Sequence, residues 1–307
     1  MKILFMNEYF SKKREEKRKK IFDFAKITVL QDLDYEMISK AYLKYSSSII
    51  QNIPERIDFD IFTNPEVSVI IPVYNQFDLT MKCLASIKDR TSCSYEIILA
   101  DDCSCDETKS IEEKVSNIKI IRNTVHLGFL KNCNQAVIEA KGKFLYFLNN
   151  DTQLMPNAMD FLLNTLSENN NCGAVGSKLI FPNGKLQSAG SEIDNYTLRP
   201  RLIGMYDNPL KSEYNQIKTV DYSCGASLMI KKNLWGTGFD EIFSPGYFEE
   251  TDFCLRLKAE GYDVLYCPQS EVIHFTSQSF GYRNKELINS NFKKFENKWK
   301  NKIRKIN

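Results

Sequence analysis

The sequence predicts an α/β fold in which a mostly parallel, Rossmann-like central sheet carries helices on both faces. Between residues 67 and 169, apolar runs of strand length alternate with segments of helical periodicity, and the links between them are short. Such alternation is typical of βαβ units, whose sheets are covered on both sides. With 307 residues and 43% hydrophobic content, the chain can bury a sizeable core, in one large domain with additions or in two domains.

The first 64 residues are predicted to form a helical extension that ends in a linker at Asn64-Pro65. Within residues 21–43, apolar side chains recur every three or four positions, which is the periodicity of a helix. These side chains are Phe22, Ala25, Val29, Leu33, Met37 and Ala41.

The central segment, residues 65–280, is predicted to be the α/β domain. The expected strands are residues 67–73, 95–101, 117–122 and 143–148, and the expected helices are 77–90, 106–116, 129–140 and 156–169. After residue 172 the alternation weakens into a mixed region. A helix is expected at 249–260, because carboxylates open it and Gly261 ends it. Short strands are expected at 262–267 and 271–275.

Residues 281–307 are predicted to form a basic amphipathic helix. Its apolar stripe is Ile288, Phe292, Phe295, Trp299 and Ile303. Residues 11–20 carry a net charge of +5 and residues 293–305 carry +6, so the acidic remainder sums to −9 within a total of +2. Such a helix can lie on an anionic membrane surface, pair between subunits of a homo-oligomer, or pack on the protein's own core with a solvated basic face.

Composition excludes several classes of protein. The net charge of +2 argues against a nucleic-acid binder. Nine cysteines without a CxxC motif indicate mostly buried, reduced thiols. The first 20 residues place an apolar stretch before a basic run, unlike a secretory signal, and about 18 consecutive apolar residues occur nowhere. We therefore expect a cytoplasmic protein, with the inner face of the membrane as an alternative location.

Polar clusters follow three predicted strands at the edge where parallel sheets bind ligands. They are Pro72-Val73-Tyr74-Asn75, Asp101-Asp102-Cys103-Ser104 and Asn149-Asn150-Asp151-Thr152. The chain has neither a GxGxxG motif after the first strand nor a P-loop motif. Because no glycine-rich loop is present to cradle a phosphate, a diphosphate here needs a cation. Carboxylate oxygens suit Mg²⁺ or Mn²⁺.

The ordered set PVYN, ADD, LNND, CGA, FEETD and a late histidine resembles the inverting family 2 glycosyltransferases. The resemblance covers about residues 65–280. It implies a GT-A type fold, a catalytic domain at 65–280 and a nucleotide-diphosphate sugar as donor. The NDT turn resembles the bacterial rhamnosyltransferase-like subgroup, which leaves UDP- and dTDP-sugars open as donors.

The resemblance implies a nucleotide site made of Pro72, Val73, Tyr74, Asn75, Asp102, Asn149 and Asn150. In it, Asp102 accepts a hydrogen bond from N3–H of uracil or thymine, because a carboxylate only accepts. The alternative is that Asp102 caps a helix, a role that Ser104 could also fill. His126 is interpreted as an ordinary loop residue.

The resemblance also implies a metal site at Asp151 and His274. Asn149 stands where the family has the first Asp of its Asp-x-Asp motif, so Asp151 is the expected carboxylate ligand. The imidazole of His274 favours Mn²⁺ over Mg²⁺. The alternatives are a polar turn that caps a helix for residues 149–151 and a structural role for the histidine.

The catalytic base is implied to lie in Glu249-Glu250-Thr251-Asp252, with Glu250 at the base position. Glu249 and Asp252 are expected to raise the pKa of Glu250 by like-charge repulsion. The alternative is that these carboxylates cap the helix that they open.

The small residues Cys224, Gly225 and Ala226 are implied to lie below the donor sugar, where the backbone can approach a ligand closely. Trp235 and Tyr247 are candidates to stack on the acceptor, although aromatic residues in such a region can equally belong to the core.

The leading interpretation is a metal-dependent inverting glycosyltransferase. Its acceptor is expected to be a saccharide, lipid-linked saccharide or glycoconjugate of a bacterial surface polysaccharide pathway. Two alternatives remain. The missing first Asp is compatible with a catalytically silent nucleotide- or sugar-binding protein or scaffold. A sugar nucleotidyltransferase would need a glycine-rich basic loop after the first strand, which PVYNQFD is not.

Overall fold

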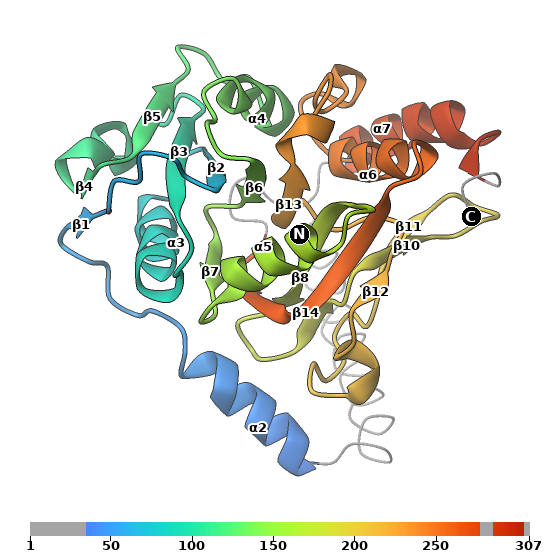
Figure 1. Cartoon of the computed structure of the whole chain (residues 1–307), viewed down its shortest axis with the longest axis horizontal. Coiled ribbons are helices and arrows are strands. Elements are labelled where there is room, and N and C mark those ends of the chain that lie inside the picture. The colour runs from blue at the N-terminus through green and yellow to red at the C-terminus, as the bar shows by residue number, and fades with distance from the viewer. Residues whose placement is uncertain (1–34, 277–284, 304–307) are drawn as a thin grey trace, which may run out of the picture.

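The computed structural model describes residues 35–276 and 285–303, and it confirms the α/β fold of GT-A type. A mixed, mostly parallel sheet of ten strands forms the centre of this described part, with the main-path order β12-β14-β8-β13-β6-β2-β3-β5 (Figure 1). The parallel half consists of β2 (Val67–Val73), β3 (Tyr95–Asp101), β5 (Lys119–Arg122) and β6 (Phe144–Leu148).

The other half of the sheet is mixed. Its strands are β7 (Thr152–Leu154), β8 (Cys172–Ile180), β9 (Leu186–Ser188), β12 (Lys218–Thr219), β13 (Ser227–Lys231) and β14 (Asp263–His274). Strand β13 runs antiparallel to both β6 and β8, whereas β14 runs parallel to β8. Two small pairs lie outside the main sheet, β1 (Ile57–Asp58) with β4 (Val115–Ser116) and β10 (Ser191–Ile193) with β11 (Pro200–Leu202).

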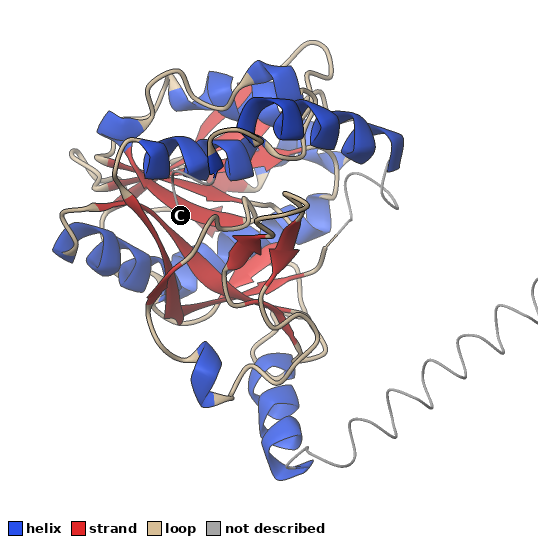
Figure 2. Ribbon diagram, turned by 90° about the vertical axis from the view of Figure 1, so that its right-hand side faces the viewer, coloured by secondary structure: helices blue, strands red, loops and turns tan. Residues whose placement is uncertain are grey.

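Helices cover both faces of the sheet, as Figure 2 shows. One hydrophobic core contains buried residues of α3 (Phe77–Arg90) and α5 (Ala158–Glu168). The core on the other face contains residues of α2 (Tyr35–Ser46), α4 (Phe129–Val137), α6 (Glu249–Ala259) and α7 (Lys285–Trp299). Four short 3-10 helices are η1 (Glu107–Glu113), η2 (Ser212–Tyr214), η3 (Lys232–Leu234) and η4 (Glu241–Phe243).

The structure supports the third alternative for the tail helix. Phe295, Trp299 and Ile303 are at most 2% exposed, and they belong to the same core as α4 and α6. The apolar stripe is thus packed against the protein's own core, fully at these three residues and partly at Ile288 and Phe292.

Three predicted elements differ from the structure. Residues 106–116 form η1 and β4 instead of one α-helix, since Ser110 leaves the helical region and the Thr108 carbonyl accepts a hydrogen bond from Arg122. Residues 262–275 form one strand, β14, with an irregularity between Cys267 and Glu271. Pro268 lies in that irregularity and has no N–H for the ladder. The strand β7 was not predicted. Residues 22–33 of the predicted N-terminal stripe lie outside the described part of the chain.

Candidate active site at the carboxyl ends of the strands

The predicted site residues come together because β13 pairs antiparallel with β6. Ser227 of β13 lies opposite Leu148, the last residue of β6. The next residues along each strand also meet, since the Asn149 amide donates to the Ala226 carbonyl at 3.1 Å. This register places the segment 224–226 beside the segment 149–151.

Asp151 and His274 meet because the short strand β7 pairs antiparallel with the end of β14. His274 lies opposite Thr152, and its Nε2 atom is 3.2 Å from Oδ1 of Asp151. Both side chains are buried. Nδ1 of His274 lies 3.1 Å from Oε1 of Gln187 on β9, and this contact holds the ring with its Nε2 atom toward Asp151.

The two asparagines of the turn differ in their surroundings. Asn150 has a structural role, since its amide donates to the Thr80 hydroxyl at 2.9 Å and thereby ties the end of β6 to α3. Oδ1 of Asn149 is buried and has no hydrogen-bond partner among the described residues. A buried acceptor without a partner destabilises the folded protein by about 1–3 kcal/mol. Of the two asparagines, Asn149 is therefore the one whose side chain a ligand would supply with a missing hydrogen bond.

The carboxylate of Asp102 accepts more hydrogen bonds from the protein itself than the sequence predicted. Its Oδ1 accepts from the Leu127 amide at 2.8 Å and from Asn123 at 2.9 Å. Its Oδ2 accepts from the Gly128 amide at 2.8 Å and lies 2.9 Å from Nδ1 of His126. The four acceptor positions of a carboxylate are thus filled. A base N3–H can be accepted only after one donor withdraws, and His126 is the half-exposed one.

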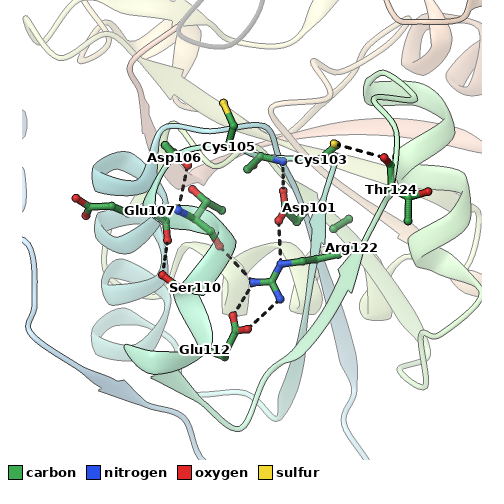
Figure 3. Close-up of polar contacts among 12 residues, drawn as sticks. Asp101, Cys103, Cys105, Asp106, Glu107, Ser110, Glu112, Arg122 and Thr124 are labelled. Carbon is green, nitrogen blue, oxygen red and sulfur yellow. Dashed lines mark hydrogen bonds and ion pairs between the residues drawn. The ribbon is translucent and has the colours of Figure 1, made fainter.

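The loop after β3 is held by the neighbouring carboxylate, Asp101. Figure 3 shows the Arg122 guanidinium between Asp101 and Glu112, with Nε 3.2 Å from Asp101. The other Asp101 oxygen accepts from the Ser104 amide. Asp106, and not Ser104, caps the following helix by accepting from Thr108. These contacts fix the loop that faces the nucleotide positions.

The end of β2 contributes its predicted residues to the same edge. Pro72 and Val73 are buried opposite β3, and the Val73 carbonyl accepts from the Asp102 amide at 2.8 Å. Asn75 has φ 58°, and its side-chain oxygen accepts from the Cys105 amide at 2.8 Å. Asn tolerates this left-handed conformation better than most residues.

Sequence reasoning missed His126. Its ring lies 4.4 Å, centroid to centroid, from the ring of Tyr74, and it contacts Asp102. The only signal was its position just before Gly128-Phe129. Gln187 was missed as well, and no local pattern could have found it, because only the pairing of β9 with β8 brings it to His274.

Glu249 and Glu250 open α6 after two residues in the left-handed region, Tyr247 with φ 75° and Phe248 with φ 78°. Aromatic residues rarely adopt this conformation, and such strain is typical of functional segments. Oε2 of each glutamate is buried without a hydrogen-bond partner in the described part of the chain. Glu250 also packs against Gly225. A Cβ added at Gly225 would lie 3.6 Å from the Cβ of Glu250.

Burial raises the pKa of both carboxyls. For Glu249 the pKa is raised well above its ordinary value by burial first and by the charge of Glu250 second. For Glu250 burial raises the pKa, while backbone hydrogen bonds, including one from Gly225, oppose the rise. The direction agrees with the sequence prediction, but the predicted cause was wrong, since desolvation dominates and Asp252 contributes to neither group.

Asp252 is a structural residue. It is 0% exposed, and its carboxylate accepts from Nε1 of Trp299 at 2.8 Å and from Nε of Arg256 at 3.1 Å. Because Asp252 follows Glu250 by two residues, about 200° around the helix axis, it points away from Glu250 and contacts α7. The prediction that it belongs to the base cluster therefore needs correction.

Trp235 belongs to a cluster of aromatic rings. Its ring stacks on Phe147 at 5.1 Å and contacts Phe239 and Phe253 at 4.9 and 5.2 Å. These contacts favour the alternative that Trp235 belongs to the core, although the residue remains partly exposed. Tyr247 remains partly exposed next to the glutamates.

The donor set suits a hard or borderline divalent cation. Asp151 offers carboxylate oxygen, His274 offers Nε2, and Asn149 has a spare buried oxygen. The described residues contain no group of three His, Cys, Asp or Glu side chains that could hold a metal alone. Two protein ligands fit an ion that takes its other ligands from substrate oxygens and water, as Mg²⁺ and Mn²⁺ commonly do.

An apolar cavity of about 470 Å³ lies away from this edge. Its walls come from residues 38–43 of α2 and from loops 183–185 and 206–209, and none of the predicted site residues lines it. Among the described helices, none has the length and apolar character needed to cross a bilayer.

The fold is that of the GT-A type glycosyltransferases. The family model "Glycosyl transferase family 2" matches residues 68–237, more than half of the chain, and the chain belongs to this family. It is 25% identical to an N-acetylglucosaminyl-diphospho-decaprenol L-rhamnosyltransferase of Mycobacterium tuberculosis over 69% of this chain and 77% of that protein.

Two further comparisons agree. The O-antigen biosynthesis protein RfbC of Myxococcus xanthus is 26% identical over 73% of this chain. The structure of GalNAc-T7 with UDP, GalNAc and Mn²⁺ has the same fold, with a TM-score of 0.56 and 18% identity over 69% of this chain and 44% of that chain. The chain spans only 18% to 28% of the length of two of its curated relatives.

Proposed function

We propose that this chain transfers a sugar, with inversion, from a UDP- or dTDP-sugar to a hydroxyl of a saccharide or lipid-linked saccharide. The observation that carries the proposal is the meeting of three segments at one sheet edge. Nε2 of His274 is 3.2 Å from Asp151, and the pKa of the Cys224 thiol is raised to about 12 by burial first and then by the charges of Glu250, Glu249 and Asp151.

In the proposed reaction, Glu250 takes the proton of an acceptor hydroxyl. The resulting oxygen attacks the anomeric carbon from the face opposite the diphosphate, and the bond from that carbon to the diphosphate oxygen breaks. Asp151 and His274 would hold a divalent cation, Mn²⁺ or Mg²⁺, which supplies positive charge to the departing diphosphate. Pro72, Val73, Tyr74, Asn75, Asp102, Asn149 and Asn150 would line the nucleotide.

The acceptor side is proposed from position. Gly225 and Tyr247 flank Glu250, so the acceptor hydroxyl would enter between the loop before β13 and the start of α6. The mycobacterial relative is named for a lipid-linked acceptor, N-acetylglucosaminyl-diphospho-decaprenol. This supports a polyprenyl-diphosphate saccharide of a surface polysaccharide pathway as the acceptor class, met at the inner face of the membrane.

The test begins with thermal shifts of the purified protein with UDP, dTDP and their sugar conjugates, with Mn²⁺ or with EDTA. Binding of the correct donor raises Tm by mass action. The release of UDP or dTDP is then measured for the wild type, Asp151→Ala and Glu250→Gln. Loss of release in both variants supports the proposal, whereas nucleotide binding without release by the wild type would favour a catalytically silent binding protein.

A further inference from the structure

Helix α7 contacts the backbone just before the glutamate pair through one buried amide. Asn291 is 0% exposed, and its amide donates to the carbonyls of Phe243 at 2.7 Å and Gly246 at 2.8 Å. A longer bond of 3.4 Å reaches the carbonyl of Tyr247. One side chain thus fixes three carbonyl groups of the segment that leads into α6.

The same helix also bonds to the side chain of Asp252, just after the glutamate pair. Nε1 of Trp299 donates to Asp252 at 2.8 Å, and Nζ of Lys298 lies 2.8 Å from the same carboxylate. Asp252 follows Glu250 by two residues. Figure 1 shows α6 and α7 lying beside one another along this contact.

Between these two attachments lies the strained backbone. Tyr247 and Phe248 both have φ above 70°, which costs of order 1–3 kcal/mol each and persists only when neighbours hold it. The Phe248 ring packs against Phe295 and Phe292 of α7 at 5.3 and 6.0 Å. The helix therefore contacts the strained pair by rings and its flanks by hydrogen bonds.

We propose that α7 is a positioning element for the catalytic glutamates, and that Asn291 is the positioning residue that sets the direction of the Glu249–Glu250 backbone. The inference rests on the proposed role of Glu250 as the base. Small displacements matter because an error of 1 Å in a reacting group can cost about a hundredfold in rate. The C-terminal helix thereby acquires a role in the reaction without touching substrate.

The decisive variant is Asn291→Asp. It keeps the shape and the bond accepted from Lys294, but it replaces the donating amide with an oxygen that faces three carbonyls. Asn297→Asp is the matched control, because it makes the same change on the exposed side of α7. Trp299→Phe is a second test variant, which removes only the donor to Asp252 and keeps most of the ring.

Two measurements are made on the full chain with Mn²⁺. Calorimetric titration with UDP and dTDP gives the nucleotide Kd and the number of binding-competent sites. Release of nucleotide from UDP-glucose and dTDP-rhamnose, with water as acceptor, gives the rate per competent site. We expect Asn291→Asp to lose at least about tenfold in this rate with a Kd within about threefold of the wild type, and Asn297→Asp to change neither.

Hydrogen–deuterium exchange supplies a readout that needs no turnover. We expect Asn291→Asp and Trp299→Phe to speed exchange in residues 243–252 and to leave Cys172–Ile180 unchanged. Either of two results would overturn the inference. One is that residues 243–252 of the two variants exchange as slowly as in the wild type. The other is that Asn291→Asp releases nucleotide at the wild-type rate per competent site. If Glu250→Gln keeps its activity, the proposed base itself fails, which is a separate result.

Discussion

At the scale of single residues, burial is the main determinant of the chemistry at this edge. The two glutamates of α6 have raised pKa values because of burial, and for Glu249 the charge of Glu250 is a second, smaller cause. A carboxyl with a raised pKa is a stronger base when ionised near neutral pH, but it makes the folded protein less stable there. Burial of these carboxyls thus raises their proton affinity and lowers the free energy of unfolding near neutral pH.

This exchange predicts a stabilised variant, Glu249→Gln. The folded protein holds the Glu249 proton above the ordinary pKa near 4.5, whereas the unfolded chain releases it. Wild-type stability therefore falls as pH rises from about 4.5 toward the raised pKa. The variant should gain about 1–3 kcal/mol in free energy of unfolding at pH 7–8, and the gain should shrink toward pH 4.5. Urea unfolding at several pH values measures this, and a gain that grows with acidity would contradict it.

A second prediction concerns Gly128, which bonds to Asp102 and contacts Pro245 of the segment before α6. It has φ +85°, and an added Cβ would lie 2.4 Å from Cβ of Pro245. Gly261 has a similar φ of +90° but has no atom within 4 Å of an added Cβ. Gly128→Ala should therefore cost about 2 kcal/mol more than Gly261→Ala, since only the first combines strain with a clash. Equal losses in urea unfolding would mean that the Pro245 contact relaxes freely.

At the scale of elements, α2 is joined to the sheet by a buried polar network around Glu271. Tyr45 donates to Glu271 at 2.9 Å, and Lys44 lies 2.6 Å from the same carboxylate. Lys178, with 1% of its side chain exposed, donates to Asn215 and lies 3.4 Å from Glu271. Desolvation lowers the pKa of Lys178 and Glu271 opposes this. The described part of the N-terminal extension is therefore packed into the α/β core.

The network makes α2 testable with a matched pair of variants. Tyr45→Phe removes the hydroxyl bonded to Glu271 and should cost about 1.5–3 kcal/mol, because hydrogen bonds to charged groups are stronger than neutral ones. Tyr42→Phe, one turn away and 53% exposed, should change stability by less than about 0.5 kcal/mol. Chemical unfolding compares the two, and equal effects would show that the Tyr45 hydroxyl adds nothing.

Sequence patterns predicted elements better than they predicted contacts. β2, α3 and β3 have the predicted bounds, because apolar runs and helical periodicity reflect local burial. The predicted α-helix at 106–116 was wrong, because a tertiary bond from Arg122 competes for the Thr108 carbonyl. At the site, motif order predicted which segments meet. It could not show that Asp252 faces α7 or that Gln187 supports His274, since both depend on long-range register.

At the scale of the whole molecule, the described parts of both terminal extensions belong to the catalytic core. Tyr45 of α2 and Trp299 of α7 share one hydrophobic cluster with residues of β6 and β8. The boundaries at 64/65 and 280/281 remain predictions, but neither described extension folds against itself alone. Removing one of them would expose apolar surface of the catalytic core.

The thiols offer a test of the folded state as a whole. All nine cysteines lie in the described residues and are free, and only Cys103 and Cys105 are exposed. Burial raises the pKa of most of the others, to about 12 for Cys83, Cys172 and Cys254. Native protein should therefore react rapidly with an aromatic disulfide reagent at two thiols, and at nine after denaturation. Rapid reaction of Cys103→Ser/Cys105→Ser protein would contradict this packing.

The pairing of β7 with the end of β14 has a consequence for how the protein is made. A chain that has left the ribosome up to residue 237 contains Asp151, but neither Glu250 nor His274. Synthesis proceeds at about 5–20 residues per second, so Asp151 and its neighbours exist for seconds before these segments emerge. During that interval the proposed metal and base residues are not yet together, and α7, which follows both Glu250 and His274 in the chain, adds the contacts that we propose to position the glutamates.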